Sequence, residues 1–258
     1  RHLDEVEQEQ VDAPISNGEY PNYSHKTPLM LAANHGHVDV VTELLRRGAN
    51  PHVVLEGSSA LMEAISAARL GVVQALLRYD PSLADEAVGG KKPLLMTVER
   101  HQSYEPAILQ ELLKAGAKAQ EVYGDKGFTP LHVLVSSAPY PTNPACRASV
   151  LERIKYLTDN MTDVNVLNRK EQTPLILAIA NQADSSVLQR LLECGAEPSP
   201  AVMQAVIYKE RDDVKDVVSM LVEARADPNA SAITGTPGSR LLHYAAGLGN
   251  YRAVKALI

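Results

Sequence analysis

The stretch KTPLMLAANHGHVDVVTELLRRGANP, residues 26–51, holds two short apolar segments separated by a single glycine. Thr27 can accept the free backbone N–H groups of a helix start, and Pro28 suits the first helical position because its missing N–H costs nothing there. The apolar residues that follow share one helical face, and Gly36 suits the left-handed conformation that ends a helix. The sequence therefore predicts a short helix from Pro28 to just before Gly36.

A second amphipathic helix is predicted directly after that glycine. Its apolar residues keep the i, i+1, i+4, i+5 spacing of a helical stripe, and Gly48 stops it. The stripe consists of Val40, Val41, Leu44 and Leu45. Helices shorter than about 12 residues are marginal in water, so both helices must bury their stripes against neighbours. The predicted unit is a helix, a turn, a second helix and a loop.

The same unit recurs along the chain, as the positions of the helix-start dipeptide show. These dipeptides are Thr27-Pro28, Ser59-Ala60, Lys92-Pro93, Thr129-Pro130, Thr173-Pro174, Ser199-Pro200 and Arg240-Leu241. The first three starts lie 32 and 33 residues apart, and the later spacings need insertions or deletions. A fixed period of this length is typical of stacked repeats that share one continuous core.

Four of these segments resemble ankyrin repeats: TPLMLAANHGHVDVVTELLRRGAN, TPLHVLV, TPLILAIANQ and LLHYAAGLGNYRAVKALI. The resemblance implies an all-α ankyrin-repeat solenoid of about seven helix-turn-helix repeats with short β-hairpin fingers. It also implies an L-shaped outline, a concave groove made by the finger tips and first helices, and no catalysis.

The predicted domain organisation has two parts. Residues 1–21 are polar and acidic and are expected to form a flexible flank, while residues 22–258 form the ankyrin-repeat domain. The repeats are expected to begin near 22, 54, 87, 124, 168, 197 and 235, with the last one truncated. Because the sequence begins without Met and ends inside a helical pattern, we expect a fragment of a longer protein.

Three irregularities are predicted. The sixth repeat should lack a finger, because almost no residues separate Gly195-Ala196 from Ser199-Pro200, and this junction is expected to be a weak point of the stack. Extra residues at His101–Glu105 should lengthen the turn of the third repeat. The insertion SAPYPTNPACR, Ser137–Arg147, carries three prolines and is expected to be a long loop, either functional or merely tolerated.

Composition excludes several classes of function. The net charge of −6 disfavours a general nucleic-acid binder, and two cysteines are too few for a disulfide framework. No apolar run approaches the roughly 18 residues that cross a bilayer, and the N-terminus lacks the apolar segment of a secretory signal. We therefore expect no nucleic-acid partner, no direct membrane insertion and a cytoplasmic or nuclear location.

The histidines are the main candidates for chemistry. His35 and His37 form an H-x-H, but Gly36 places them in different backbone conformations, and no carboxylate or cysteine stands at metal-ligand spacing. The ankyrin resemblance implies that His132 and His243 bridge the backbones of adjacent repeats. No nucleophile can be paired with a base from the sequence. We therefore expect no enzyme, no catalytic residue, no metal site and no cofactor.

Two asparagines, Asn165 and Asn229, follow second helices in segments that resemble ankyrin sites of asparagine hydroxylation. The alternative, which we favour, is that both hold their turns through bonds between side chain and backbone.

The predicted partner-binding residues lie at the finger tips and at the ends of first helices. They are Tyr23, Lys26, His35, Lys91, Glu99, Arg100, Lys126, Phe128, Arg169 and Lys170. Over all finger tips and first-helix ends, basic residues outnumber acidic ones. The acidic residues there are Glu56, Glu99 and Asp125. The groove is therefore expected to bind a protein or peptide, in particular an acidic or mixed-charge segment, with the aromatic residues as anchors. The alternative for the surface is a solvated face without a partner.

The predicted function is a protein–protein interaction module that acts as the recognition or scaffold arm of a larger protein. The alternative is a regulatory or autoinhibitory ankyrin domain attached to an enzyme or channel. In one autoinhibitory arrangement the acidic arm of residues 1–20 would lie in the basic groove.

Overall fold

The computed structural model describes residues 12–14, 26–99, 106–136, 143–208, 212–232 and 238–258. These residues form α-helices, one 3-10 helix and isolated β-bridges, with no extended strand among them. The chain divides into two compact units, Arg1–Ala119 and Gln120–Ile258, here called unit 1 and unit 2. The predicted all-α fold is confirmed.

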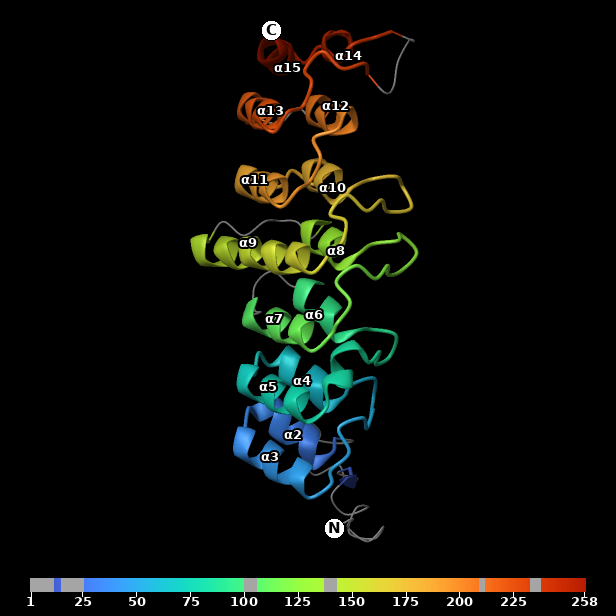
Figure 1. Cartoon of the computed structure of the whole chain (residues 1–258), viewed down its shortest axis with the longest axis vertical. Coiled ribbons are helices and arrows are strands. Elements are labelled where there is room, and N and C mark those ends of the chain that lie inside the picture. The colour runs from blue at the N-terminus through green and yellow to red at the C-terminus, as the bar shows by residue number, and fades with distance from the viewer. Residues whose placement is uncertain (1–11, 15–25, 100–105, 137–142, 209–211, 233–237) are drawn as a thin grey trace. The chain divides into compact units, whose positions relative to one another are not determined.

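Unit 1 stacks three helix pairs, coloured blue to green in Figure 1. Its helices are α2 (Pro28–His35), α3 (Val38–Arg46), α4 (Ala60–Ser66), α5 (Leu70–Tyr79), the 3-10 helix η1 (Pro81–Asp85), α6 (Pro93–Glu99) and α7 (Pro106–Lys114). The first helices α2 and α4 pack on each other, and the second helices α3 and α5 do the same.

Unit 2 stacks four helix pairs in the same way. Its helices are α8 (Pro130–Ser136), α9 (Pro144–Asp159), α10 (Pro174–Ala180), α11 (Ser185–Glu193), α12 (Pro200–Tyr208), α13 (Val214–Glu223), α14 (Leu241–Gly247) and α15 (Tyr251–Leu257). In both units each first helix begins at the second residue of the predicted dipeptide, so all seven predicted starts are confirmed.

The caps act as the sequence predicts. Thr27 has extended backbone angles, and its hydroxyl accepts the Met30 N–H at 3.2 Å. Gly36 ends α2 with φ +84°, a conformation that costs little only in glycine. A Cβ at Gly36 would also lie 2.9 Å from Cδ of Arg69, so a larger residue would in addition displace the Arg69 side chain.

The core is distributed along each stack. First helices are buried on nearly all sides: α4 has six buried residues, and one of them is the carboxylate Glu63. Second helices bury one stripe only, which in α5 is Val72, Val73, Leu76 and Leu77. This asymmetry follows from position, because each first helix lies between neighbouring first helices, its own second helix and the fingers.

The insertion in the fourth repeat differs from the prediction. Residues 137–142 lie outside the described residues, but Pro144 through Arg147 are the first turn of the 16-residue helix α9, not a loop. The Asn143 side chain caps this helix by accepting the Ala145 N–H at 2.9 Å. Pro144 occupies the first helical turn, where its missing N–H is harmless, so here a proline begins the helix.

The fingers are shorter than hairpins. Each of four fingers closes with a single antiparallel bridge: Leu55 with Ser58, Val88 with Lys91, Tyr123 with Phe128 and Ser231 with Arg240. The sixth repeat has none, because α11 ends at Glu193 and α12 begins at Pro200, as predicted. The extra residues predicted at His101–Glu105 lie outside the described residues.

The predicted flank of residues 1–21 falls mostly outside the described residues. Asp12 belongs to the part that is described, and its carboxylate accepts the backbone N–H of Asn50 at 3.0 Å. Partial burial raises the pKa of Asp12, and the bond from Asn50 opposes that change. The domain boundary at residue 22 remains a prediction.

Candidate functional site

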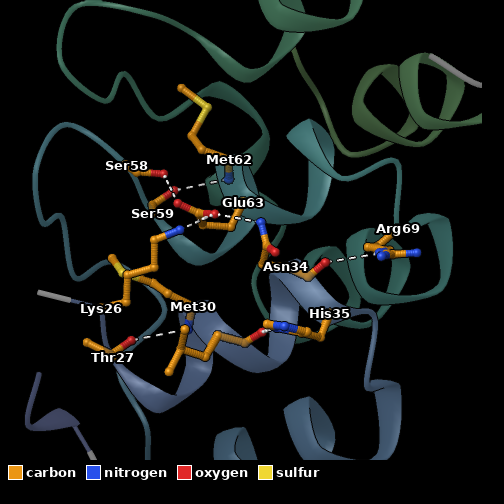
Figure 2. A network of polar contacts seen from close by, with 11 residues as sticks. Lys26, Thr27, Met30, Asn34, His35, Ser58, Ser59, Met62, Glu63 and Arg69 are labelled. Atoms are coloured by element: carbon orange, nitrogen blue, oxygen red, sulfur yellow. Dashed lines mark hydrogen bonds and ion pairs between the residues drawn. The ribbon is translucent and has the colours of Figure 1, made fainter. Parts of the chain in front are cut away.

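The polar centre of unit 1 is Glu63, which the sequence reading did not select. Figure 2 shows its carboxylate between residues of the first two repeats. It accepts bonds from Lys26 Nζ at 2.8 Å, from Asn34 Nδ2 at 2.9 Å and from Ser58 Oγ at 2.9 Å. Its side chain is only 10% exposed. The available signal was a single charged residue within the otherwise apolar run SALMEAI.

This network changes the reading of Lys26. The sequence placed it among the free basic residues of a groove, but its ammonium forms an ion pair with Glu63 and is about a quarter exposed. Its charge is therefore largely neutralised by the second repeat. Lys26 holds two repeats together, and little of its charge remains for a partner.

Two other predicted residues of unit 1 lie at exposed positions. Lys91 closes the second finger bridge and is exposed, and Glu99 is the exposed last residue of α6. Tyr23 and Arg100 lie outside the described residues.

His35 and His37 have different backbone conformations, as expected, yet the turn at Gly36 brings their rings together. Their rings stack with centroids 5.9 Å apart and planes inclined by 9°. Nδ1 of His35 also bonds to the Leu31 carbonyl, which fixes the ring at the end of α2. Gly36 makes a turn tight enough to bring the two rings together. No group of three or more potential metal ligands occurs among the described residues.

Unit 2 gathers four predicted residues on two adjacent fingers. We call Lys126, Phe128, Arg169 and Lys170 the finger cluster. Lys126 Nζ lies 5.6 Å from the centroid of the Phe128 ring, within the range of a cation–π contact. The Phe128 ring stacks on His132 with centroids 5.5 Å apart. The aromatic ring is thus half-buried and rigidly placed beside an exposed cation.

Backbone contacts hold the two fingers of the cluster together. The Arg169 N–H donates to the Lys126 carbonyl at 3.0 Å, and Arg169 Nη1 donates to the Asp125 carbonyl at 3.0 Å. Gly127 makes this approach possible, because a Cβ there would lie 2.9 Å from Cγ of Arg169. Within the described part of the chain, Lys126, Arg169 and Lys170 take part in no ion pair with a carboxylate. Their charges are exposed in a fixed arrangement.

His132 has the bridging task that the ankyrin resemblance implies. It is fully buried, its Nδ1 accepts the Thr129 N–H at 3.3 Å, and its Nε2 lies 3.1 Å from the Gln172 carbonyl. Burial lowers the pKa of His132, and the bond to Gln172 opposes that change. Because Nδ1 accepts an N–H and Nε2 faces a carbonyl oxygen, these bonds fit the neutral ring with its proton on Nε2. His243 makes the equivalent local bond to the Arg240 N–H, at 3.1 Å.

Asn165 holds a different element from the one expected. Its own turn is held by Asp163, whose carboxylate accepts the Asn165 N–H at 2.7 Å, and Asp227 serves Asn229 in the same way. The Asn165 side chain instead reaches the junction without a finger. It donates to the Gly195 carbonyl at 3.2 Å and accepts the Glu197 N–H at 2.8 Å. It thus replaces part of the missing finger's contacts.

His52 forms an exposed clamp in unit 1. Its Nδ1 lies 2.8 Å from the Glu86 carboxylate, and its Nε2 lies 3.0 Å from that of Asp80. The bond with Glu86 is the main cause that raises the pKa of His52, and Asp80 adds to it. The histidine joins the loop after α3 to both ends of η1.

The clamp gives a pH prediction. The folded pKa of His52 lies above its unfolded value of about 6.5, so its stabilisation is present below pH 6.5 and is lost as the pH rises through the folded pKa. The His52→Gln variant should therefore melt about 1–2 °C below the parent chain at pH 5.5, with the gap closing by pH 8.5. Thermal melting followed by circular dichroism measures this. A gap that widens with pH would refute the clamp.

Two stacks of short helix pairs, each pair followed by a finger or a tight loop, define a helical repeat protein. A family model of ankyrin repeats matches residues 6–87, and solved ankyrin domains share the fold across both units. Residues 6–87 thus match ankyrin repeats, and both units have the ankyrin-repeat fold. Ankyrin repeats generally mediate protein–protein interaction.

The structural matches are ankyrin repeat domains at 22% sequence identity. That of Bcl-3, a member of the IkappaB protein family, gives a TM-score of 0.68 and covers 90% of this chain and 98% of its own. That of human ASB11 gives a TM-score of 0.61 and covers 90% of this chain and 96% of its own. At this identity the likeness shows the fold alone.

Curated relatives are much longer proteins. The chain is 27% identical over 256 residues to the Arabidopsis thaliana E3 ubiquitin-protein ligase KEG. This match spans 93% of this chain and 15% of that protein. It is 32% identical over 117 residues to the Bos taurus mitochondrial disaggregase, a match that spans 44% of this chain and 17% of that protein. It is 29% identical over 152 residues to the Arabidopsis thaliana potassium channel AKT2/3, a match that spans 58% of this chain and 17% of that protein. The chain thus spans about a sixth of the length of these relatives. None of the helices described here is long and apolar enough to cross a membrane.

Proposed function

We propose that this domain binds an acidic or mixed-charge segment of a partner protein through the finger cluster of unit 2. The observation that carries the proposal is the set of exposed cations Lys126, Arg169 and Lys170 on two adjacent fingers, with Lys126 beside the half-buried Phe128. A rigid aromatic ring among exposed cations offers an apolar contact and charge-assisted bonds at the same place. Because the fingers are held to each other through their backbones, little ordering is required on binding.

The local charges limit which partner fits. Asp125 and Glu171 flank the three cations in sequence and are exposed, so the surface carries both signs with an excess of positive charge. A partner segment with spaced acidic residues and one apolar side chain complements this pattern better than a uniformly acidic one. In unit 1, Lys91 and Glu99 remain predicted contacts, while Lys26 is already paired with Glu63.

A charge-reversal experiment tests the proposal. The whole chain is used to capture a partner, crosslinking maps its binding face, and calorimetry measures its affinity. The triple variant Lys126→Glu, Arg169→Glu and Lys170→Glu is expected to weaken binding by much more than tenfold, because three charge-assisted contacts become repulsive. The fall should lessen at high salt, where exposed charges are screened.

A matched control makes the same change of charge on second helices of unit 2. Lys155, Lys215 and Lys255 are all exposed there, and their replacement by Glu should leave the affinity nearly unchanged. Equal affinities of the parent chain and the finger variant would refute the finger cluster as the binding surface. Equal losses of affinity in both triple variants would mean that the effect arises from net charge alone.

A second candidate is a regulatory or autoinhibitory arm of a larger enzyme or channel. The relatives favour it, since a ligase, a disaggregase and a channel each match over only 15% to 17% of their length. Catalysis would then reside in another part of such a protein. Deleting the repeats from the full-length protein and measuring its basal activity distinguishes this candidate, which requires the activity to change without any added partner.

An intramolecular use of residues 1–20 is a separable form of this candidate. Deleting these residues should raise partner affinity if the acidic arm occupies the finger cluster, and unchanged affinity would exclude it. A location in the cytoplasm or nucleus belongs to the same proposal, and the absence of a disulfide between Cys146 and Cys194 supports it.

A further inference from the structure

A groove of about 450 Å³ lies on unit 1 between the second helices α3 and α5, away from the fingers. Figure 1 places these two helices side by side on the face opposite the finger turns. The small residues Gly71 and Ala75 of α5 line the groove opposite α3. A Cβ added at Gly71 would already lie 3.0 Å from Cγ2 of Val38. The volume is in the range of about 300–1,000 Å³ that is usual for ligand sites.

The lining is apolar with a basic rim. Val38 and Tyr79, which line the groove, are 38% and 53% exposed, so two of its large side chains face solvent. The charged residues that line the groove are Arg46 and Arg78. The site therefore offers an apolar surface with guanidinium groups at its edge.

The two arginines retain positive charge. Arg46 bonds to Glu43, but Arg47 bonds to the same carboxylate, so one carboxylate serves two guanidinium groups. Arg78 takes part in none of the ion pairs within the described residues. An occupant with a carboxylate would supply the missing negative charge in a paired, directional geometry.

Unit 2 provides an internal comparison. An equivalent groove of about 490 Å³ lies between α11 and α13, and its charged lining residues are Glu193, Asp216 and Glu223. The two grooves have similar volumes and occupy the same place in the repeat, but their charges are opposite. The basic rim in unit 1 is thus a property of those particular residues and is not general to second-helix grooves of this chain.

We infer that the groove between α3 and α5 binds a short partner segment in which an apolar side chain is flanked by a carboxylate. The apolar side chain contacts Gly71 and Ala75, and the carboxylate bonds to Arg78 or Arg46. This surface is separate from the finger cluster and does not depend on it. The domain therefore has a second docking surface, selective for apolar–acidic segments.

The test uses three blocked five-residue peptides that alternate leucine with glutamate, glutamine or lysine. Binding to the whole chain is followed by NMR of the valine and leucine methyl groups at low salt. The glutamate peptide should shift the Val38 and Leu45 methyls and bind at least threefold more tightly than the glutamine peptide, while the lysine peptide should not saturate. The double variant Arg46→Gln and Arg78→Gln should remove the preference for glutamate over glutamine.

Filling the groove provides the decisive variant. Ala75→Leu keeps a strong helix former on α5 and should abolish binding, whereas Ala224→Leu in the groove of unit 2 should leave it unchanged. Equal affinity for the glutamate and glutamine peptides, binding retained by Ala75→Leu, or shifts confined to unit 2 would overturn the inference. Sedimentation that finds a dimer abolished by Ala75→Leu would assign the groove to a second copy of the chain and would overturn the peptide assignment as well. Each result is independent of the finger variants.

Discussion

The Glu63→Ala variant is expected to lose about 3 kcal/mol of unfolding free energy. The carboxylate is 10% exposed and accepts bonds from Lys26, Asn34 and Ser58. Its removal leaves an ammonium and an amide without their partner at the contact between α2 and α4. Since Lys26 is still 28% exposed and can reach water, the loss should fall at the lower end of the 3–5 kcal/mol found for fully buried ion pairs.

Urea unfolding followed by circular dichroism measures this loss, with tyrosine fluorescence as a second probe because the chain has no Trp. The matched control is Glu43→Ala, which removes a carboxylate that also has several partners. Hydrogen bonds from Arg46 and Arg47 lower the pKa of Glu43 to about 2, yet its side chain is 49% exposed. Because solvent screens its exposed ion pairs, the Glu43→Ala variant should have nearly the same free energy of unfolding as the parent chain. Equal losses of unfolding free energy in Glu63→Ala and Glu43→Ala would contradict the stabilising role of the buried Glu63 carboxylate.

The His132→Ala variant is expected to lose about 2 kcal/mol, since it breaks two buried hydrogen bonds and leaves a cavity beneath Phe128. The loss should depend on pH. Burial places the folded pKa of His132 below its unfolded value of about 6.5, so the native histidine contributes fully above pH 6.5 and loses its contribution as the pH falls toward the folded pKa. The gap between the two chains should therefore be largest near neutral pH and should shrink at pH 5.

Urea unfolding at several pH values measures this gap, and His243→Ala is its control. The His243 side chain stands at the same position of its repeat but is exposed and bonds to the nearby Arg240 N–H. It should cost no more than a few tenths of a kcal/mol at any pH. A gap for His132→Ala that grows as the pH falls would mean that the buried ring is charged. The stability difference for His132→Ala is expected to grow with pH, whereas the difference for His52→Gln is expected to shrink with pH.

The insertion of the fourth repeat shows where local reasoning failed. The three prolines within Ser137–Arg147 predict a loop, but a proline excludes only the continuation of a helix and favours its beginning. Asn143 before Pro144 is a cap signal that could have located the start of α9 from the sequence. The stacking of His35 on His37 was missed for a different reason, because the angle of a glycine turn decides it.

The amino-acid sequence by itself determined the repeat, the seven helix starts and the missing sixth finger. These features rest on caps, prolines, glycines and apolar spacing, all of which act within a few residues of each other. Only the tertiary structure decided which charges are neutralised and which are available. Lys26 meets Glu63 at a separation of 37 residues, and His132 meets Gln172 at 40, because stacking places one repeat against the next. A repeating backbone can be read from local patterns, but the side-chain partners it brings together depend on the neighbouring repeat.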